Sequence, residues 1–274
     1  MRAGRLLLLL PVLAYTAFSA GPYVWTAMMS LRTTDEIYAS HYGLPIPAHW
    51  GKFAVAWNEF GYATYFRNST IVAVASVVLV TVVGSMAGFA FGRRRYNFPL
   101  REPLFLLIFL SVMFPPQIML LSLFQILIQY KLFNSLTGLV LVYTVTELPL
   151  TIYLLRAFFA QIPTELEEAA RIDGCTTAGM FWRIMFPLSA PGLATIAIYN
   201  AVALWNEFVF AFVLTSSPTS RTLPLAIWDY QGQYSANIPL IMAVLSLSAL
   251  PLILIYIIGQ ERVIGGMMAG ALKG

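Results

Sequence analysis

Two carboxylates lie inside stretches that are otherwise apolar, where an ionisable group is costly unless it serves a function. Glu207 follows a tryptophan and an asparagine, so an indole, an amide and a carboxylate share one helical turn, and Glu147 lies in the preceding apolar run. An aromatic face beside hydrogen-bonding groups suits a sugar, whose ring has apolar faces and hydroxyl edges. The sequence therefore predicts a path for a polar solute lined by Trp205, Asn206, Glu207 and Glu147.

These polar residues also have a purely structural interpretation, which the sequence leaves open. Asn206 and Glu207 could join neighbouring helices by hydrogen bonds. Glu147 could satisfy backbone groups freed by Pro149, two residues further on, or lie near the outer membrane interface.

A second group of polar residues forms a short charged segment between two apolar runs, and such a segment must face water. Thr164 is followed three residues later by Glu167, a spacing that predicts a capping box at the start of a helix. Gly174 fits the left-handed position that ends a helix. A second short helix is expected from Thr176 or Thr177 until Pro187 stops it.

Two short helices at an angle would form a compact knob, and such a knob invites a soluble partner. Small alanines allow another surface to approach closely, acidic residues offer charge to a partner's arginines or lysines, and the glycine permits the turn. The residues expected to serve docking are Glu165, Glu167, Glu168, Ala169, Ala170, Asp173, Gly174 and Pro187.

Composition identifies the class of protein that must position these residues. Hydrophobic residues make up 59% of the 274 and charged residues only 10%, against about 25% in an ordinary soluble domain. The mean hydropathy is +0.76, which is typical of an integral membrane protein. Runs of about twenty apolar residues, long enough to cross a bilayer, lie near 5 to 29, 68 to 91, 103 to 126, 137 to 158, 189 to 214 and 237 to 260. The sequence thus predicts six transmembrane helices in one domain, residues 1 to 274.

The basic residues predict the orientation of these helices, because loops rich in Lys and Arg stay in the cytoplasm. Five fall on one side of the membrane: Arg32, Lys52, Arg67, Lys131 and Arg221. Eleven fall on the other side: Arg2, Arg5, Arg93, Arg94, Arg95, Arg101, Arg156, Arg171, Arg183, Arg262 and Lys273. Both termini and the charged knob are therefore expected in the cytoplasm, where ATP is present. The basic hairpin at 93 to 95 is interpreted as a membrane anchor.

Motifs for covalent chemistry are missing from the sequence. It holds no G-x-x-x-x-G-K-[ST] phosphate loop, no His-Glu-x-x-His and no Gly-x-Ser-x-Gly. Cys175 is the only cysteine, and His41 and His49, the only histidines, have no recognised ligand spacing. We therefore expect a protein that is not an enzyme and binds no metal and no nucleic acid; an ATPase, if one drives it, must be another polypeptide.

The charged knob resembles the EAA motif of permease subunits in ATP-binding-cassette (ABC) importers. The motif's elements are Glu168-Ala169-Ala170, Gly174, and Ile184 followed by Phe186-Pro187. Phe186 stands where leucine is usual and Cys175 where alanine is common, and both departures are mild. The resemblance implies that the loop 159 to 188 couples the chain to a separate ATPase.

Further segments resemble the carbohydrate-uptake branch of these permeases, in particular the maltose-transporter G-subunit type. They are the Trp-Asn-Glu-Phe turn, residues 221 to 225 and the terminal residues 269 to 274. The resemblance implies the ABC importer permease fold and alternating access for a sugar across the cytoplasmic membrane of a bacterium or archaeon. It also implies that the loop 216 to 237 reaches toward an external binding protein and that the tail 261 to 274, with Gly265, Gly266 and Gly270, runs toward the ATPase.

The partners that the resemblance implies are a second, nonidentical permease, an ATPase homodimer that binds the ATP, an extracytoplasmic sugar-binding protein and the lipid membrane. Two other functions stay open at this point: import of glycerol phosphate or another polyol derivative, and proton-coupled transport that uses Glu147 or Glu207 as the relay. A cleaved signal peptide is an alternative interpretation of the first apolar run.

Overall fold

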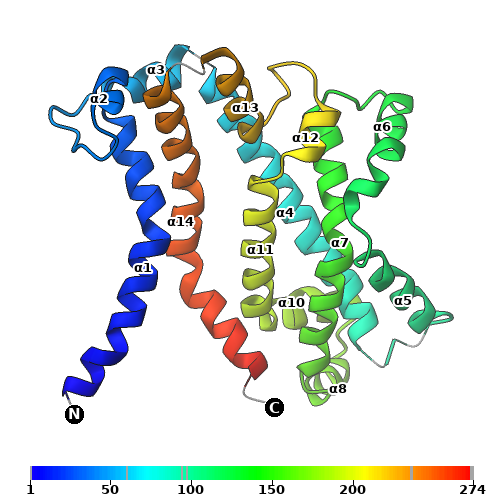
Figure 1. Ribbon diagram of the computed structural model, residues 1–274. Coiled ribbons are helices and arrows are strands. Elements are labelled where there is room, and N and C mark those ends of the chain that lie inside the picture. The colour runs from blue at the N-terminus through cyan, green and yellow to red at the C-terminus, as the bar shows by residue number, and fades with distance from the viewer. Residues whose placement is uncertain (1, 60, 94, 97, 235–236, 272–274) are drawn as a thin grey trace. The chain divides into compact units, whose positions relative to one another are not determined.

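The computed structural model describes residues 2–59, 61–93, 95–96, 98–234 and 237–271, and these residues form helices joined by loops, without a strand (Figure 1). The helices are α1 (Arg2–Ser30), α2 (Thr34–Ala39), α3 (Gly51–Glu59), α4 (Tyr62–Gly92), α5 (Arg101–Ser111), η1 (Pro116–Met119), α6 (Leu120–Gln129), α7 (Leu136–Gln161), α8 (Glu165–Ile172), α9 (Thr177–Met180), η2 (Phe181–Met185), α10 (Phe186–Leu188), α11 (Ala190–Trp205), α12 (Val209–Leu214), α13 (Leu223–Tyr234) and α14 (Ile238–Ala271). The prediction of an all-helical membrane protein is confirmed.

Among the described residues, three helices are long and apolar enough to cross a membrane unaided: Tyr62–Gly92, Leu136–Gln161 and Ile238–Gln260. The number of candidate spans rises to five if each of two bent helix pairs counts as one span. These pairs are Arg101–Ser111 with Pro116–Gln129 and Thr177–Leu188 with Ala190–Trp205. The first predicted span forms α1 but is not among these candidates. The count of six spans therefore stays a prediction.

Two predicted spans are interrupted in the structure, which corrects their description as continuous helices. The span at 103 to 126 bends by 94° between α5 and the η1–α6 helix, where Pro115 and Pro116 interrupt the backbone hydrogen bonds. The span at 189 to 214 breaks between α11 and α12, at Asn206 to Phe208. The predicted external loop 216 to 237 contains α13, and the predicted tail is helical to Ala271, while residues 272–274 lie outside the described residues.

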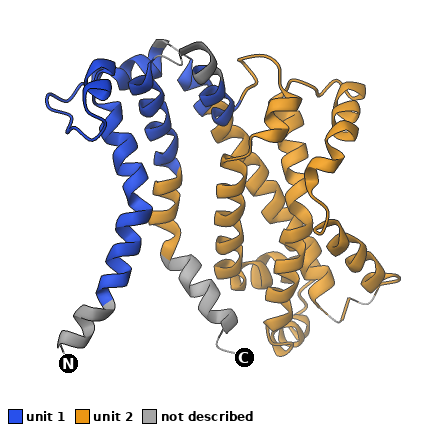
Figure 2. Cartoon of the chain, viewed as in Figure 1, with its two compact units in different colours: residues 1–66, 222–251 blue, residues 67–221, 252–274 orange. Residues whose placement is uncertain are grey.

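The chain divides into two compact units (Figure 2). Unit 1 comprises residues 1–66 and 222–251, and in it the ring of Trp57 contacts Tyr62 and Phe66 at centroid distances of 5.4 and 5.9 Å. Unit 2 comprises residues 67–221 and 252–274 and contains the charged knob and both of the predicted membrane carboxylates. The prediction of one domain spanning residues 1 to 274 stays a prediction.

Within unit 2, three glycines spaced four residues apart bring α4 against α7. A Cβ atom built on Gly84 would lie 2.5 Å from Thr151, one on Gly88 would lie 2.7 Å from Leu155, and one on Gly92 would lie 2.8 Å from a backbone oxygen of α7. Small residues at this spacing let helix backbones approach closely within a membrane. The four-residue spacing was visible in the sequence and our sequence analysis missed it.

We expect Gly88→Val to force α4 away from α7, because its Cβ would contact the backbone of α7 as well as a side chain. Overpacking of this kind typically costs about 1–3 kcal/mol. The matched control is Gly21→Val in α1, where, among the described residues, no atom beyond the helix's own backbone and the chain neighbours lies within 4 Å of the added Cβ. The measurement is the thermal unfolding midpoint in detergent, and equal midpoints for the two variants would contradict the close approach.

Candidate functional site

The charged knob consists of α8, a glycine turn and the helical run from α9 through η2 to α10. Gly174 has a φ of +76°, as predicted for the left-handed end of α8. Its N–H donates to the carbonyl of Arg171 at 2.9 Å, and the N–H of Cys175 donates to that of Ala170 at 2.9 Å. These two bonds form a Schellman motif, which satisfies the last carbonyls of the helix and reverses the chain.

The predicted capping box at the start of α8 is wrong. Thr164 has helical backbone angles, φ −71° and ψ −25°, and its side chain makes no capping hydrogen bond. The second helix agrees better with expectation, since the hydroxyl of Thr176 accepts the N–H of Gly179 at 3.1 Å. Helix continues one residue past Pro187 to Leu188 before the chain bends by 75° into α11.

Glu167 does not face a partner, because its carboxylate forms an ion pair with Arg93 at the end of α4, and both side chains are about 3% exposed. The Arg93 guanidinium also donates to the carbonyl of Phe159, at 2.9 Å, and to that of Ile162, both at the end of α7. One buried side chain thus joins α4, α7 and α8. This corrects two interpretations, Glu167 as a docking residue and Arg93 as a membrane anchor; Arg94 lies outside the described residues.

One sequence signal for the Arg93–Glu167 pair was available. Glu167 and Ala170 are three residues apart and so share one face of α8, and both are buried. An acidic residue on the apolar face of a short helix needs a cation inside the protein. The sequence could not identify which of the nearby arginines supplies it.

An aromatic cluster holds the knob to the rest of unit 2. Phe181, in the second helix of the knob, packs against Phe89 of α4 at a centroid distance of 5.3 Å, and Phe89 meets Phe159 of α7 edge-on at 5.6 Å. Ala170 of α8 and Leu193 of α11 belong to the same buried cluster. The knob is therefore packed directly against α4, α7 and α11.

Most of the predicted docking residues are exposed on the knob. Ala170 does not, because only 5% of it is exposed. Ile172 is 87% exposed, and Leu166 is also exposed on α8, so apolar and acidic groups share this surface. We missed both apolar residues in the sequence. The exposed members of the predicted set are Glu165, Glu168, Ala169, Asp173, Gly174 and Pro187.

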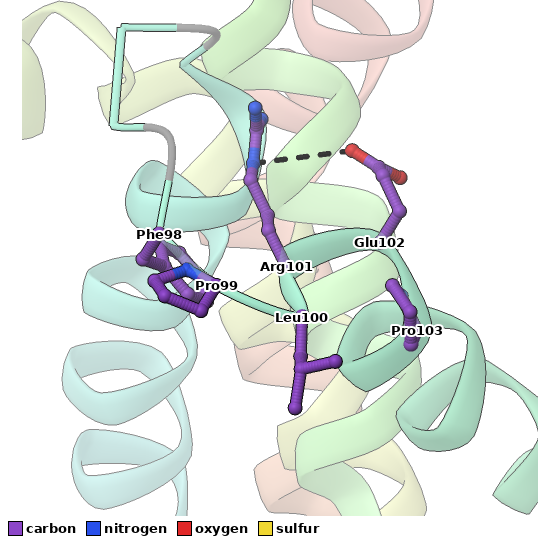
Figure 3. A pocket seen from close by; sticks show the side chains of 6 residues that line it. All are labelled: Phe98, Pro99, Leu100, Arg101, Glu102 and Pro103. Carbon is purple, nitrogen blue, oxygen red and sulfur yellow. Dashed lines mark ion pairs between the residues drawn. The ribbon is translucent and has the colours of Figure 1, made fainter.

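Two hollows border the knob and the nearby basic hairpin. One, of about 360 Å³, lies where the end of α7 meets α8 and α11, and Ile162, Leu166 and Leu188 give it an apolar lining. The other, of about 630 Å³, is lined by residues 98 to 103 (Figure 3). There Glu102 pairs with Arg156 at 3.0 Å and lies 3.9 Å from Arg101, so its carboxylate offsets part of the positive charge expected here.

Glu207 lies at the break between α11 and α12 and accepts three hydrogen bonds from the protein itself. The hydroxyl of Tyr143 on α7 donates at 2.6 Å, and the backbone N–H groups of Phe210 and Ala211 donate at 2.8 and 3.1 Å. A carboxylate at the start of a helix stabilises the unpaired N–H groups there. Glu207 thus fixes the start of α12 to α7, which agrees with the structural interpretation of this residue.

The other three predicted path residues have different surroundings. Trp205 is buried, at 6% exposure, so its indole is part of the core of unit 2. Asn206 is exposed, and its amide donates to the carbonyl of Val202 at 2.8 Å. Glu147 is partly exposed on α7, one helical turn after Tyr143, whose hydroxyl donates to Glu207. Their role in a solute path stays a prediction.

Known proteins resemble this chain over most of its length. Residues 80–267 match the family model described as "Binding-protein-dependent transport system inner membrane component". A putative ABC transporter permease of Caldicellulosiruptor sp. is 43% identical over 95% of this chain and 94% of its own length. An arabinooligosaccharide transport system permease of Halalkalibacterium halodurans is 33% identical over 95% of this chain and 94% of its own length.

The fold also has a solved counterpart. A crystal structure of a bacterial ABC transporter involved in the import of the acidic polysaccharide alginate matches with a TM-score of 0.75 at 20% identity. The match covers 95% of this chain and 98% of the other. At this identity the likeness establishes the fold alone.

Proposed function

This chain belongs to the family of inner membrane components of binding-protein-dependent transport systems, and from that premise we propose that it is the permease subunit of an ATP-driven importer of sugars or oligosaccharides. It is a multi-pass protein of the inner membrane and a non-catalytic subunit. The observation that carries the proposal is the knob: an exposed surface of acidic and apolar groups, attached by a buried ion pair to two long apolar helices.

In this proposal the knob docks on an ATPase subunit, and the ATP is bound and hydrolysed there. Glu165, Glu168 and Asp173 offer charge, and Ala169 and Gly174 let the partner approach closely. Closure of an ATPase homodimer moves the knob, and Arg93 and the aromatic cluster carry that movement to α4 and α7. The spans then open alternately to the two sides of the membrane.

The remaining partners are a second, nonidentical permease and an extracytoplasmic binding protein that delivers the solute. A sugar is the proposed solute because a relative described above, 33% identical to this chain, is a permease of an arabinooligosaccharide transport system. The mixture of aromatic and hydrogen-bonding groups near Asn206 supports it. Proton relay through Glu207 has less support, since its carboxylate already accepts three hydrogen bonds within the protein.

The test of this function is ATP hydrolysis by the assembled complex. The chain is co-expressed with its second permease and the ATPase, reconstituted in lipid vesicles, and supplied with its binding protein carrying one candidate sugar at a time. We expect hydrolysis and uptake to rise together with the cognate sugar and to stay at the basal level without the binding protein. Uptake that follows an imposed proton gradient and ignores ATP depletion would instead identify a carrier.

The proposed orientation of the chain in the membrane, with the knob in the cytoplasm, rests on the distribution of Lys and Arg: eleven lie on one predicted side and five on the other. With Cys175 replaced by serine, single cysteines at Thr219 and Glu168 report on opposite sides, and both positions are exposed. We expect an impermeant thiol reagent to label position 219 in intact cells and to label position 168 only after the cells are broken. Labelling of position 168 from outside would place the knob on the wrong side for an ATPase.

A further inference from the structure

One surface of α11 combines aromatic and polar groups that the protein itself leaves exposed. Between Gly192 and Asn206, the exposed residues of this helix are Tyr199, Val202 and Asn206. Their spacing of three and then four residues places them on a single face of the helix. Tyr199 is 49% exposed, a large fraction for an aromatic ring in a helix whose other side is buried. We call Tyr199, Val202 and Asn206 the α11 face.

A carboxylate from a second helix lies beside this face. Asn200, next to Tyr199 on α11, donates to the Thr151 hydroxyl of α7 at 3.1 Å, and Glu147 lies one helical turn before Thr151. Among the described residues, the carboxylate of Glu147, the hydroxyl of Tyr199 and the side-chain oxygen of Asn206 have no hydrogen-bond partner, whereas the Asn206 amide nitrogen donates to its own helix. Three polar groups thus retain free hydrogen-bonding capacity in one region of unit 2.

The neighbouring polar residues contrast with these three. Glu207 is adjacent in sequence, but its carboxylate is committed to Tyr143 and to the start of α12. Trp205 is directed into the core. Trp205 and Glu207 are therefore engaged within the protein, whereas Tyr199 and Asn206 stay exposed.

We propose that Tyr199, Asn206 and Glu147 form the sugar-contacting surface of this subunit, and that its ligand is a neutral oligosaccharide. The inference rests on the proposed function and assigns that function's solute to particular side chains. A tyrosine ring can stack on the apolar face of a sugar, while an amide and a carboxylate bind its hydroxyl groups. A neutral sugar fits because the three residues offer one carboxylate and no lysine or arginine, so an anionic sugar would meet repulsion without a counter-charge.

The test uses the reconstituted complex with its binding protein and measures uptake and sugar-stimulated ATP hydrolysis in parallel. We expect Tyr199→Ala and Asn206→Ala each to lower uptake at limiting sugar by about tenfold, the equivalent of about 1.4 kcal/mol of lost contact. Stimulated hydrolysis should stay within about twofold of the parent, because the binding protein and the knob are untouched. Tyr130→Ala, which removes an exposed tyrosine at the end of α6 and away from the α11 face, is the matched control and should transport nearly normally. Tyr199→Phe keeps the ring and should lose less uptake than Tyr199→Ala.

Two results would overturn this assignment. Uptake that stays at the parental rate in both alanine variants would show that the sugar does not contact the α11 face. Loss of the second permease from the purified complex of either variant would show that the face is a subunit interface. Neither result would affect the proposed function, which fails instead if the parental complex shows no sugar-stimulated hydrolysis.

Discussion

Replacing Arg93 with methionine is expected to destabilise the knob severely. The substitution removes the one cation that, among the described residues, pairs with the buried Glu167 carboxylate, and it removes the donor that Arg93 supplies to the carbonyls at the end of α7. Breaking a buried ion pair by removing one partner typically costs about 3–5 kcal/mol, because the other charge remains buried and unpaired. We expect lower levels in the membrane, a lower unfolding midpoint in detergent, and loss of coupled ATP hydrolysis.

A double variant separates the charge from the packing. Arg93→Met combined with Glu167→Met removes both charges, and replacing a buried pair by apolar groups is often neutral. The double variant should therefore regain much of the stability that Arg93→Met loses. Arg171→Met is the surface control, since this side chain is partly exposed and lies against Tyr96, 3.4 Å from its hydroxyl and 6.0 Å from its ring centroid. A double variant no more stable than Arg93→Met would mean that packing, not the unpaired charge, dominates the effect.

The sequence predicted features of the knob that depend on local backbone chemistry. Gly174 was expected to be left-handed because glycine alone adopts that conformation without cost, and Thr176 was expected at the start of a helix. The capping box failed because the Glu167 carboxylate gains more from a buried cation 74 positions away in the chain than from a local backbone N–H. Such pairings depend on which helices meet, and a single sequence does not contain that information.

The membrane spans show the same division between local and tertiary information. Average hydropathy located the apolar runs, but it cannot distinguish a straight helix from two halves joined at a sharp bend. Pro115 and Pro116 did signal the break after α5. No comparable signal marks the break at Asn206 to Phe208, where the Glu207 carboxylate stabilises the next helix by accepting its free N–H groups.

The candidate solute path illustrates why residue types alone were insufficient. Tryptophan, asparagine and glutamate in consecutive positions suggested one polar cluster, yet α11 ends at Trp205 and the chain leaves the helix at Asn206 and Glu207, so the three side chains have different surroundings. The structure directs Trp205 into the core, leaves Asn206 exposed and commits Glu207 to hydrogen bonds. The residue that shares the face of Asn206 is Tyr199, two turns earlier, and we had not singled it out in the sequence.

We expect Gly174→Asp to abolish coupling while leaving the protein inserted in the membrane. Among the described residues, and apart from its two chain neighbours, no atom lies within 4 Å of a Cβ built on Gly174, so the new side chain has room within the subunit. The left-handed conformation costs a non-glycine residue roughly 1–2 kcal/mol, and aspartate tolerates it better than most. That is too little to unfold the protein, so the main effect should come from a negative charge pressed against the docked ATPase. Sugar-stimulated hydrolysis and uptake should both fall to background.

The matched control is Gly61→Asp. Gly61 has a φ of +67°, is exposed, and would bring its Cβ no closer than 3.8 Å to its nearest neighbour, so the strain is nearly the same at a position outside the knob. Glu168→Ala should also have a small effect, since an exposed ion pair contributes only about 0–1 kcal/mol. Immunoblots establish that each variant reaches the membrane at the parental level. The prediction fails if Gly174→Asp, present at that level, transports at the parental rate just as Gly61→Asp does. In that case the glycine turn does not contact the ATPase, and another surface must carry the coupling.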